Sequence, residues 1–294
     1  MNKSPLLILL EVIFLVVFWA WVASAILFLR TTFLPRLPIR LIPEDLPAET
    51  VSFRATDGVP LKGWKLSTDP THPWVIVCHG VGSNRSDLLG IAIDLYRAGF
   101  NLLLFDFRGH GTSGGLATSF GWQEQRDLEG ALNFLGQQPD VPARPYGVYG
   151  ISMGASVALL VAARDERIGS LAADSPYTNL EESIRRHLAV MYPLLPRIPF
   201  LWFILATYRI RFGVWPRNVS PQESAAQVNP RPFLLIHGAK DRRMPLEGAQ
   251  QIFDNAGNPK ELWVIDKAGH LEGFSRCPEG YLSRLVGFFE KGLR

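Results

Sequence analysis

The chain has 294 residues, which is enough for one large domain and too few for two of ordinary size. Its apolar content of 47% allows a sizeable core, and its formal net charge is only +3. So small a charge is not the footprint of a nucleic-acid-binding protein, which needs clustered basic residues on a matching fold. The two cysteines, Cys78 and Cys277, do not make a disulfide framework.

The segment Pro5–Leu29 is almost wholly apolar and carries one charge, Glu11. As a helix it would span about 37 Å, more than the ~30 Å hydrocarbon core of a bilayer. Residues 23–25 resemble a signal-peptide cleavage site, but the apolar run is longer than that of a typical signal and continues beyond the site. We predict an uncleaved transmembrane anchor over residues 1–30, with a secretory signal as the alternative.

The charges that flank this segment bear on its orientation. Lys3 precedes it, whereas Arg30, Arg36 and Arg40 follow it. Positively charged flanks remain preferentially on the cytoplasmic side of a membrane. The larger number of positive charges after the segment favours a single-pass membrane protein whose C-terminal domain lies in the cytoplasm.

Beyond the anchor, a proline-rich stretch over residues 31–48 is predicted to be a stiff, extended linker to a globular domain of residues 49–294. Asp57-Gly58 predicts a hairpin turn. Short apolar strands then alternate with helical stretches, a pattern typical of an α/β fold with a mostly parallel sheet and helices on both faces. Strands are expected at 74–78, 102–105, 147–149, 170–173, 233–236 and 262–265, and helices at 85–98, 123–135 and 246–255.

A G-x-S-x-G pattern, typical of a nucleophile elbow, occurs twice. Around Ser152 it lies between a predicted strand and a predicted helix, and Gly150 and Gly154 would let the two approach closely. Residues 111–115 fit the same pattern, but turn-forming residues precede Ser113 and no apolar helical run follows it. We therefore predict that Ser152 is the nucleophile and that Ser113 is a loop residue.

Polar and glycine-rich motifs follow the other strands too, at the sheet edge where ligands of such folds bind. They are His79-Gly-Val-Gly, Asp106-Phe-Arg-Gly-His-Gly, His237-Gly-Ala-Lys-Asp and Gly269-His270. Together with the serine motif and in this order, they resemble the α/β-hydrolase family over the region from about residue 50 to the end. The likeness is to its serine aminopeptidase-like and esterase-like branch, which implies an α/β-hydrolase fold with a helical cap.

The resemblance implies a catalytic triad in the chain order serine, acid, histidine. His270 follows Asp241 and is the expected base, and Asp241 lies in a loop similar to the acid loop of the family. Asp174, which also ends a strand, is the alternative acid. The remaining histidines at strand ends are expected to hold loops by hydrogen bonding: His79, His110 and His237.

The family binds the oxyanion of the reaction with two backbone N–H groups, which map here to Val81 and Met153. The loops that support this site are expected to include His79, Gly80, Gly150 and Gly154.

The insertion at about residues 175–231 lies where the family places its cap, and Leu188–Trp215 is rich in apolar residues. These residues are expected chiefly to pack the cap on the domain. An apolar cap also favours a substrate with an acyl chain. A third hypothesis is that Phe200–Leu205 rests on the bilayer.

These features predict a serine hydrolase that cleaves acyl esters, thioesters or amides of an apolar substrate through an acyl-enzyme. The alternatives are an aminopeptidase-like peptide hydrolase and a non-catalytic binding scaffold. No metal or organic cofactor is expected, because no histidine–carboxylate cluster has metal-ligand spacing. The expected partners are a small-molecule or lipid-like acyl substrate and the membrane, with no nucleic acid. The oligomeric state stays open.

Overall fold

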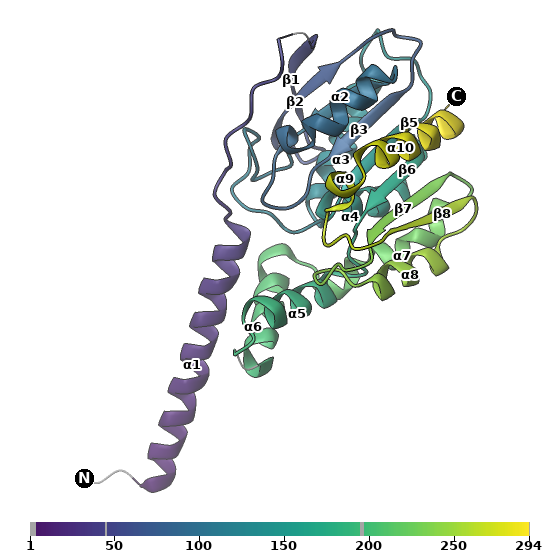
Figure 1. Cartoon of the computed structure of the whole chain (residues 1–294). Helices are drawn as coiled ribbons and strands as arrows, with labels where there is room; N and C mark the ends of the chain where they lie inside the picture. Colours follow the sequence, from purple (N-terminus) through teal and green to yellow (C-terminus); the bar gives the residue numbers. More distant parts are fainter. Residues whose placement is uncertain (1–3, 45, 195–196, 294) are drawn as a thin grey trace.

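The computed structural model describes residues 4–44, 46–194 and 197–293. Within these ranges eight strands form one sheet in the order β1-β2-β4-β3-β5-β6-β7-β8 (Figure 1). β1 and β2 form the predicted antiparallel hairpin and β2 pairs antiparallel with β4, whereas the pairs from β4 to β8 are parallel. The strands are Ala48–Arg54, Pro60–Leu66, Trp74–Cys78, Asn101–Phe105, Tyr146–Ile151, Ile168–Asp174, Phe233–Gly238 and Lys260–Ile265.

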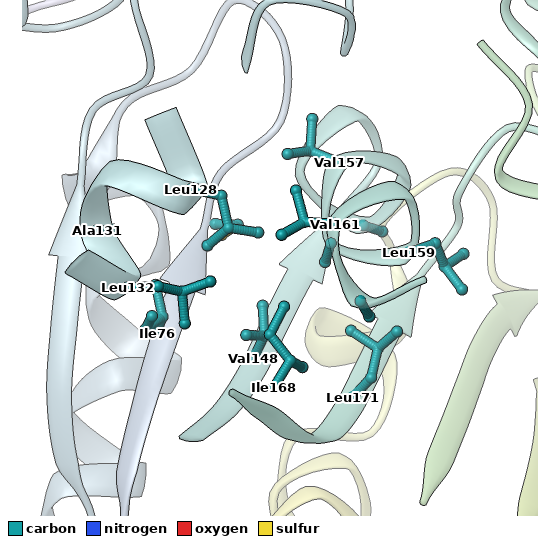
Figure 2. Close-up of a cluster of buried hydrophobic side chains, with 14 of the residues drawn as sticks. Ile76, Leu128, Ala131, Leu132, Val148, Val157, Leu159, Val161, Ile168 and Leu171 are labelled. Carbon is teal, nitrogen blue, oxygen red and sulfur yellow. The ribbon is translucent and has the colours of Figure 1, made fainter. Parts of the chain in front are cut away.

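Helices cover both faces of the sheet, as the apolar strands predict. Successive strand residues point to opposite faces, so Ile76 of β3 packs under α3 and α4 while Val75 and Val77 pack under α2 and α10. In Figure 2, Leu128 of α3 and Val161 of α4 face each other above the sheet. The domain helices are α2 (Leu89–Arg97), α3 (Glu124–Gly136), α4 (Met153–Ala162), α8 (Leu246–Asn255), α9 (Gly273–Arg276) and α10 (Pro278–Leu293).

The helix expected over 85–98 is divided. A 3₁₀ turn, Arg85–Leu88, precedes α2. The turn begins with a capping box in which the Asn84 side chain accepts from the Ser86 N–H and the Asp87 carboxylate accepts from the Asn84 N–H. These bonds satisfy N–H groups that the start of a helix leaves free.

The expected cap lies between β6 and β7. It contains α5 (Leu180–Met191), α6 (Arg197–Phe212), the 3₁₀ turns Pro216–Asn218 and Ala225–Val228, and α7 (Pro221–Ser224). A separate apolar cluster joins the cap to the sheet domain, and it includes Tyr177 and Leu180 together with Tyr208 of α6.

The N-terminal segment forms α1 (Pro5–Thr32), a helix of 28 residues that is long and apolar enough to cross a membrane. A signal sequence passes the same test of length and composition. Its buried residues recur every four positions, at Ala20, Ser24, Phe28 and Thr32, and so form one stripe. The stripe lies in the C-terminal half of α1, and α6 lies beside this half. The N-terminal half of α1 projects away from the domain (Figure 1). Lys3, used above to infer orientation, lies outside the described residues.

The predicted linker is extended, but it is bound along the domain. The Arg36 guanidinium donates to the carbonyls of Gly111, Ser113 and Gly115. The Asn84 side-chain amide donates to the carbonyls of Leu37 and Pro38, each at 3.3 Å. Farther along, Leu46 is buried in the core that also contains α2. The segment therefore fixes the C-terminal end of α1 against the domain.

Candidate active site

Ser152 occupies a sharp turn between β5 and α4. Its φ of 50° and ψ of −115° are strained for a residue with a side chain. A Cβ on Gly150 would lie 2.5 Å from the carbonyl oxygen of Gly154, and one on Gly154 would collide with the carbonyl of Cys78. Both glycines therefore allow the close approach of strand and helix that the sequence pattern predicts.

The structure brings Ser152, His270 and Asp241 into one hydrogen-bonded chain. His270 Nε2 lies 3.1 Å from Ser152 Oγ, and His270 Nδ1 lies 2.6 Å from Asp241 Oδ2. A carboxylate can only accept, so we assign the proton of the neutral ring to Nδ1. Nε2 is then free to accept the proton of the serine hydroxyl, which is the arrangement that activates a serine as a nucleophile.

Asp241 stays ionised in its buried position. Burial alone would raise the pKa of its carboxyl, but the hydrogen bonds from His270 and from the N–H of Met244 lower the pKa below its usual value. The backbone N–H groups of Arg243 and Met244 both donate to Oδ1 at 2.9 Å. The carboxylate is therefore held in place from both sides, with Oδ2 directed at the histidine.

The alternative residues have other partners. Ser113 is buried, and its hydroxyl donates to the carbonyl of Asp106 at 2.6 Å and accepts from the N–H of Lys62 at 2.9 Å. Asp174 accepts from the hydroxyls of Ser175 and Tyr281, at 2.8 and 2.7 Å, and burial raises the pKa of its carboxyl. Ser113 thus closes a loop, and Asp174 lies in a buried polar cluster.

His79 holds the start of the candidate oxyanion loop. Its Nδ1 donates to the carbonyl of Gly80 at 2.7 Å, and its Nε2 accepts from the N–H of Phe107 at 3.0 Å. Burial lowers the pKa of His79 to about 3, so the ring remains neutral and can keep both bonds.

His110 holds the other end of this loop. Its Nε2 accepts from the N–H of Gly82 at 3.1 Å, and its Nδ1 donates to the carbonyl of Arg108 at 2.8 Å. Arg108 is itself buried and paired with Asp127 and Asp57. Removing one partner of a buried ion pair typically costs about 3–5 kcal/mol, so the loop rests on a rigid support. The sequence predicts Asp57 only as a turn residue and does not indicate that Asp57 and Asp127 pair with Arg108, because this pairing depends on the tertiary fold.

The two candidate oxyanion donors lie at the Ser152 end of one cavity. Val81 and Met153 line this cavity with Ser152 and His270. Met153 is the first residue of α4, so its N–H has no partner within the helix. A Cβ on Gly80 would lie 3.5 Å from that of Ser152, which shows how closely the loop approaches the serine.

The cavity measures about 340 Å³ and is lined chiefly by apolar side chains. Its walls come from the C-terminal end of α1, from α5 and from α6. The apolar lining includes Leu27, Phe28, Leu34, Leu180, Ile184, Leu188, Val190, Met191, Ile204 and Met244. Sequence reasoning did not place α1 in this wall, because no motif in an apolar helix indicates which neighbour it packs against.

His237 lies behind the acid loop. Its Nε2 donates to the carbonyl of Met244 at 2.7 Å, and the same nitrogen lies 4.0 Å from Asp241 Oδ2. Among the described residues, no group of three or more His, Cys, Asp or Glu side chains could hold a metal ion.

Comparison with known proteins shows that the chain is similar to serine aminopeptidases and to an esterase. A family described as serine aminopeptidase, S33, matches residues 69–212. The protein Rv2307c of Mycobacterium tuberculosis is 30% identical over 236 residues, which cover 79% of this chain and 76% of that protein. YqkD of Bacillus subtilis is 29% identical over 237 residues, with the same coverage. The solved structure of the esterase Pf2001 of Pyrococcus furiosus shares 28% identity and a TM-score of 0.74, and the match covers 90% of this chain and 99% of that one.

The strain at Ser152 gives a stability prediction that is independent of activity. Ser152→Gly should be more stable to unfolding than Ser152→Ala by about 1 kcal/mol, because both lose the hydroxyl but only alanine keeps a Cβ at positive φ. Urea denaturation of the two full-length variants in detergent measures the difference. Equal stability, or a more stable alanine variant, would show that the turn is unstrained.

Proposed function

Because the chain belongs to the α/β-hydrolase family, we propose that it is a serine hydrolase that cleaves acyl esters of an apolar substrate. The observation that carries the proposal is the hydrogen-bonded chain of Ser152, His270 and Asp241 at the end of an apolar cavity. Thioesters and amides would react by the same chemistry. The likeness to an esterase favours esters among these three.

In the first half of the proposed reaction, Ser152 Oγ attacks the carbonyl carbon of the substrate while His270 Nε2 takes the hydroxyl proton. Asp241 keeps the ring oriented and stabilises its protonated form. The N–H groups of Val81 and Met153 stabilise the oxyanion of the tetrahedral intermediate. Collapse of the intermediate breaks the ester C–O bond, and His270 passes its proton to the departing alcohol. An acyl group then remains on Ser152.

The second half repeats the chemistry with water. His270 takes a proton from a water molecule, and the resulting hydroxide attacks the acyl carbonyl carbon. The second tetrahedral intermediate collapses, the Ser152 oxygen leaves with the proton from His270, and a carboxylic acid is released. No cofactor takes part in this proposed sequence.

We further propose that α1 anchors the enzyme in a membrane, with its C-terminal domain on the cytoplasmic side. The part of α1 before its first buried residue, Pro5–Trp19, would be about 22 Å long as a helix. This is shorter than the ~30 Å hydrocarbon core. A bilayer spanned by α1 would therefore extend to the level of α6.

The outer surface of the cap supports this placement. Several of its large apolar side chains are exposed, with fractions of 97% at Leu194, 85% at Ile198, 64% at Trp202 and 82% at Ile210. Such a surface is stabilised by contact with acyl chains. The cavity between α1 and the cap would then lie beside the lipids from which an apolar substrate comes.

An aminopeptidase would need acidic groups near Ser152 to bind a substrate ammonium. The charged side chains among the described residues that line the cavity are basic: Arg30, Arg186 and Arg243. Glu181 and Glu182, the acidic candidates in the cap, pair with arginines of their own helix. These charges favour the acyl ester over a free peptide N-terminus.

Covalent labelling tests whether Ser152 is activated. We expect a fluorophosphonate probe to label the full-length protein and Ser113→Ala but not Ser152→Ala. The Ser152 hydroxyl is hydrogen-bonded to a histidine, whereas the Ser113 hydroxyl donates to a backbone carbonyl. In-gel fluorescence measures the labelling. A folded native chain that stays unlabelled would favour a binding scaffold. Loss of labelling in Ser113→Ala alone would identify Ser113 as the nucleophile.

Acyl-chain preference tests the role of α1 in the cavity. Leu27→Ala should lower kcat/KM for a dodecanoyl ester relative to a butanoyl ester by several-fold, since Leu27 of α1 lines the cavity and each buried methylene contributes about 0.8 kcal/mol. Leu29→Ala is the matched control, because Leu29 is exposed on α1 and does not line the cavity. An equal effect of both substitutions would contradict an acyl-binding role for this wall.

A further inference from the structure

A second cavity of about 530 Å³ adjoins the one at Ser152. The two share lining residues, among them Arg186 of α5 and Arg243 of the acid loop. Their linings differ in character: the Ser152 cavity is chiefly apolar, whereas the second is lined by polar side chains of both the cap and the domain. These include Thr178, Asn179, Glu182, Gln222, Glu247 and Gln251.

Arg243 supplies positive charge at this junction, where Glu182 and Glu247 also line the wall of the polar cavity. Among the described residues no ion pair is recorded for its side chain, which is exposed to the cavities. Its charge, after burial, contributes to lowering the pKa of His187, another residue of the cavity wall. Arg243 itself lines the Ser152 cavity, so its positive charge lies at the wall of the space that holds the substrate.

Arg186 provides a second guanidinium on the opposite side, from the cap. Its one recorded acidic partner is Glu182, at 3.8 Å one helical turn away, and both side chains are about two-fifths exposed. Such exposed pairs are weak, so this arginine can exchange partners. Guanidinium groups bind phosphate and carboxylate in a bidentate manner.

We propose that this junction binds an anionic group on the alcohol part of the substrate, so that the enzyme prefers acyl esters bearing a phosphate or carboxylate. This inference rests on the proposed function. The acyl chain occupies the apolar cavity between α1 and the cap. The ester lies at Ser152, and the anionic group contacts Arg186 and Arg243 at the entrance to the polar cavity. A substrate with an ammonium at this position is repelled.

The test compares two esters of equal chain length, a monoacylglycerol and the corresponding monoacylglycerol phosphate, with the full chain in neutral detergent. The native protein should show a kcat/KM ratio that favours the phosphate. Arg186→Gln and Arg243→Gln should each reduce this ratio about tenfold, a typical effect of losing one charge-assisted hydrogen bond. The backbone bond from residue 243 to Asp241 is unaffected by this change.

Each variant has a matched neighbour as its control. Arg185→Gln and Arg242→Gln alter arginines that are adjacent in sequence but line neither cavity, and they should leave the ratio unchanged. The kcat/KM ratio is measured in two arms, one with dissolved short-chain esters and one with long-chain esters bound to vesicles. A preference in the dissolved arm assigns recognition to the phosphate ester itself, and one confined to vesicles assigns it to a lipid headgroup. Either result supports an anion site.

Other results would overturn the proposal. Equal hydrolysis of both esters by the native protein, or an unchanged ratio in Arg186→Gln and Arg243→Gln, would exclude an anion site while leaving the hydrolase intact. Loss of binding to anionic vesicles with an unchanged ratio would assign the arginines to membrane contact instead. Failure to hydrolyse either ester, with no labelling of Ser152, would contradict the proposed function and the inference together.

Discussion

The turn at Ser152 depends on an unusually close approach of backbone to backbone. α4 begins directly against the ends of β3 and β5; a side chain at Gly154 would prevent the first contact, and one at Gly150 would prevent the second. The approach forces a positive φ at Ser152, directs its hydroxyl at His270 and leaves the first N–H groups of α4 free. One steric constraint thus sets the nucleophile and one candidate oxyanion donor.

Buried polar groups hold the surrounding loops in place beside this turn. His79 and His110 are neutral rings that each accept from one backbone N–H and donate to one carbonyl. Their bonds hold the loop that contains Val81, and Arg108, whose carbonyl accepts from His110, is itself held by buried ion pairs. Because an unpaired polar group in such a position would be costly, the loop has little freedom to shift when a substrate binds.

The sheet and the placement of Ser152, His270 and Asp241 could be predicted because the signals are local. Each of these side chains follows an apolar strand, and parallel strands bring such positions to one edge. The contact between α1 and the cap could not be predicted in this way. It depends on a stripe of residues that meets α6 only in the folded chain, and the carbonyls that bind Arg36 have no sequence signal at all.

In the proposed reaction, Ser152 carries the acyl group during turnover. The most direct measurement is rapid mixing of the full-length protein with a nitrophenyl acyl ester, an acid quench, and mass spectrometry of the intact chain and its peptides. An acyl-enzyme at Ser152 would give a burst of nitrophenol that matches the enzyme concentration and one added acyl mass on the peptide containing Ser152. An acyl group on another residue, or undiminished turnover by Ser152→Ala, would contradict it.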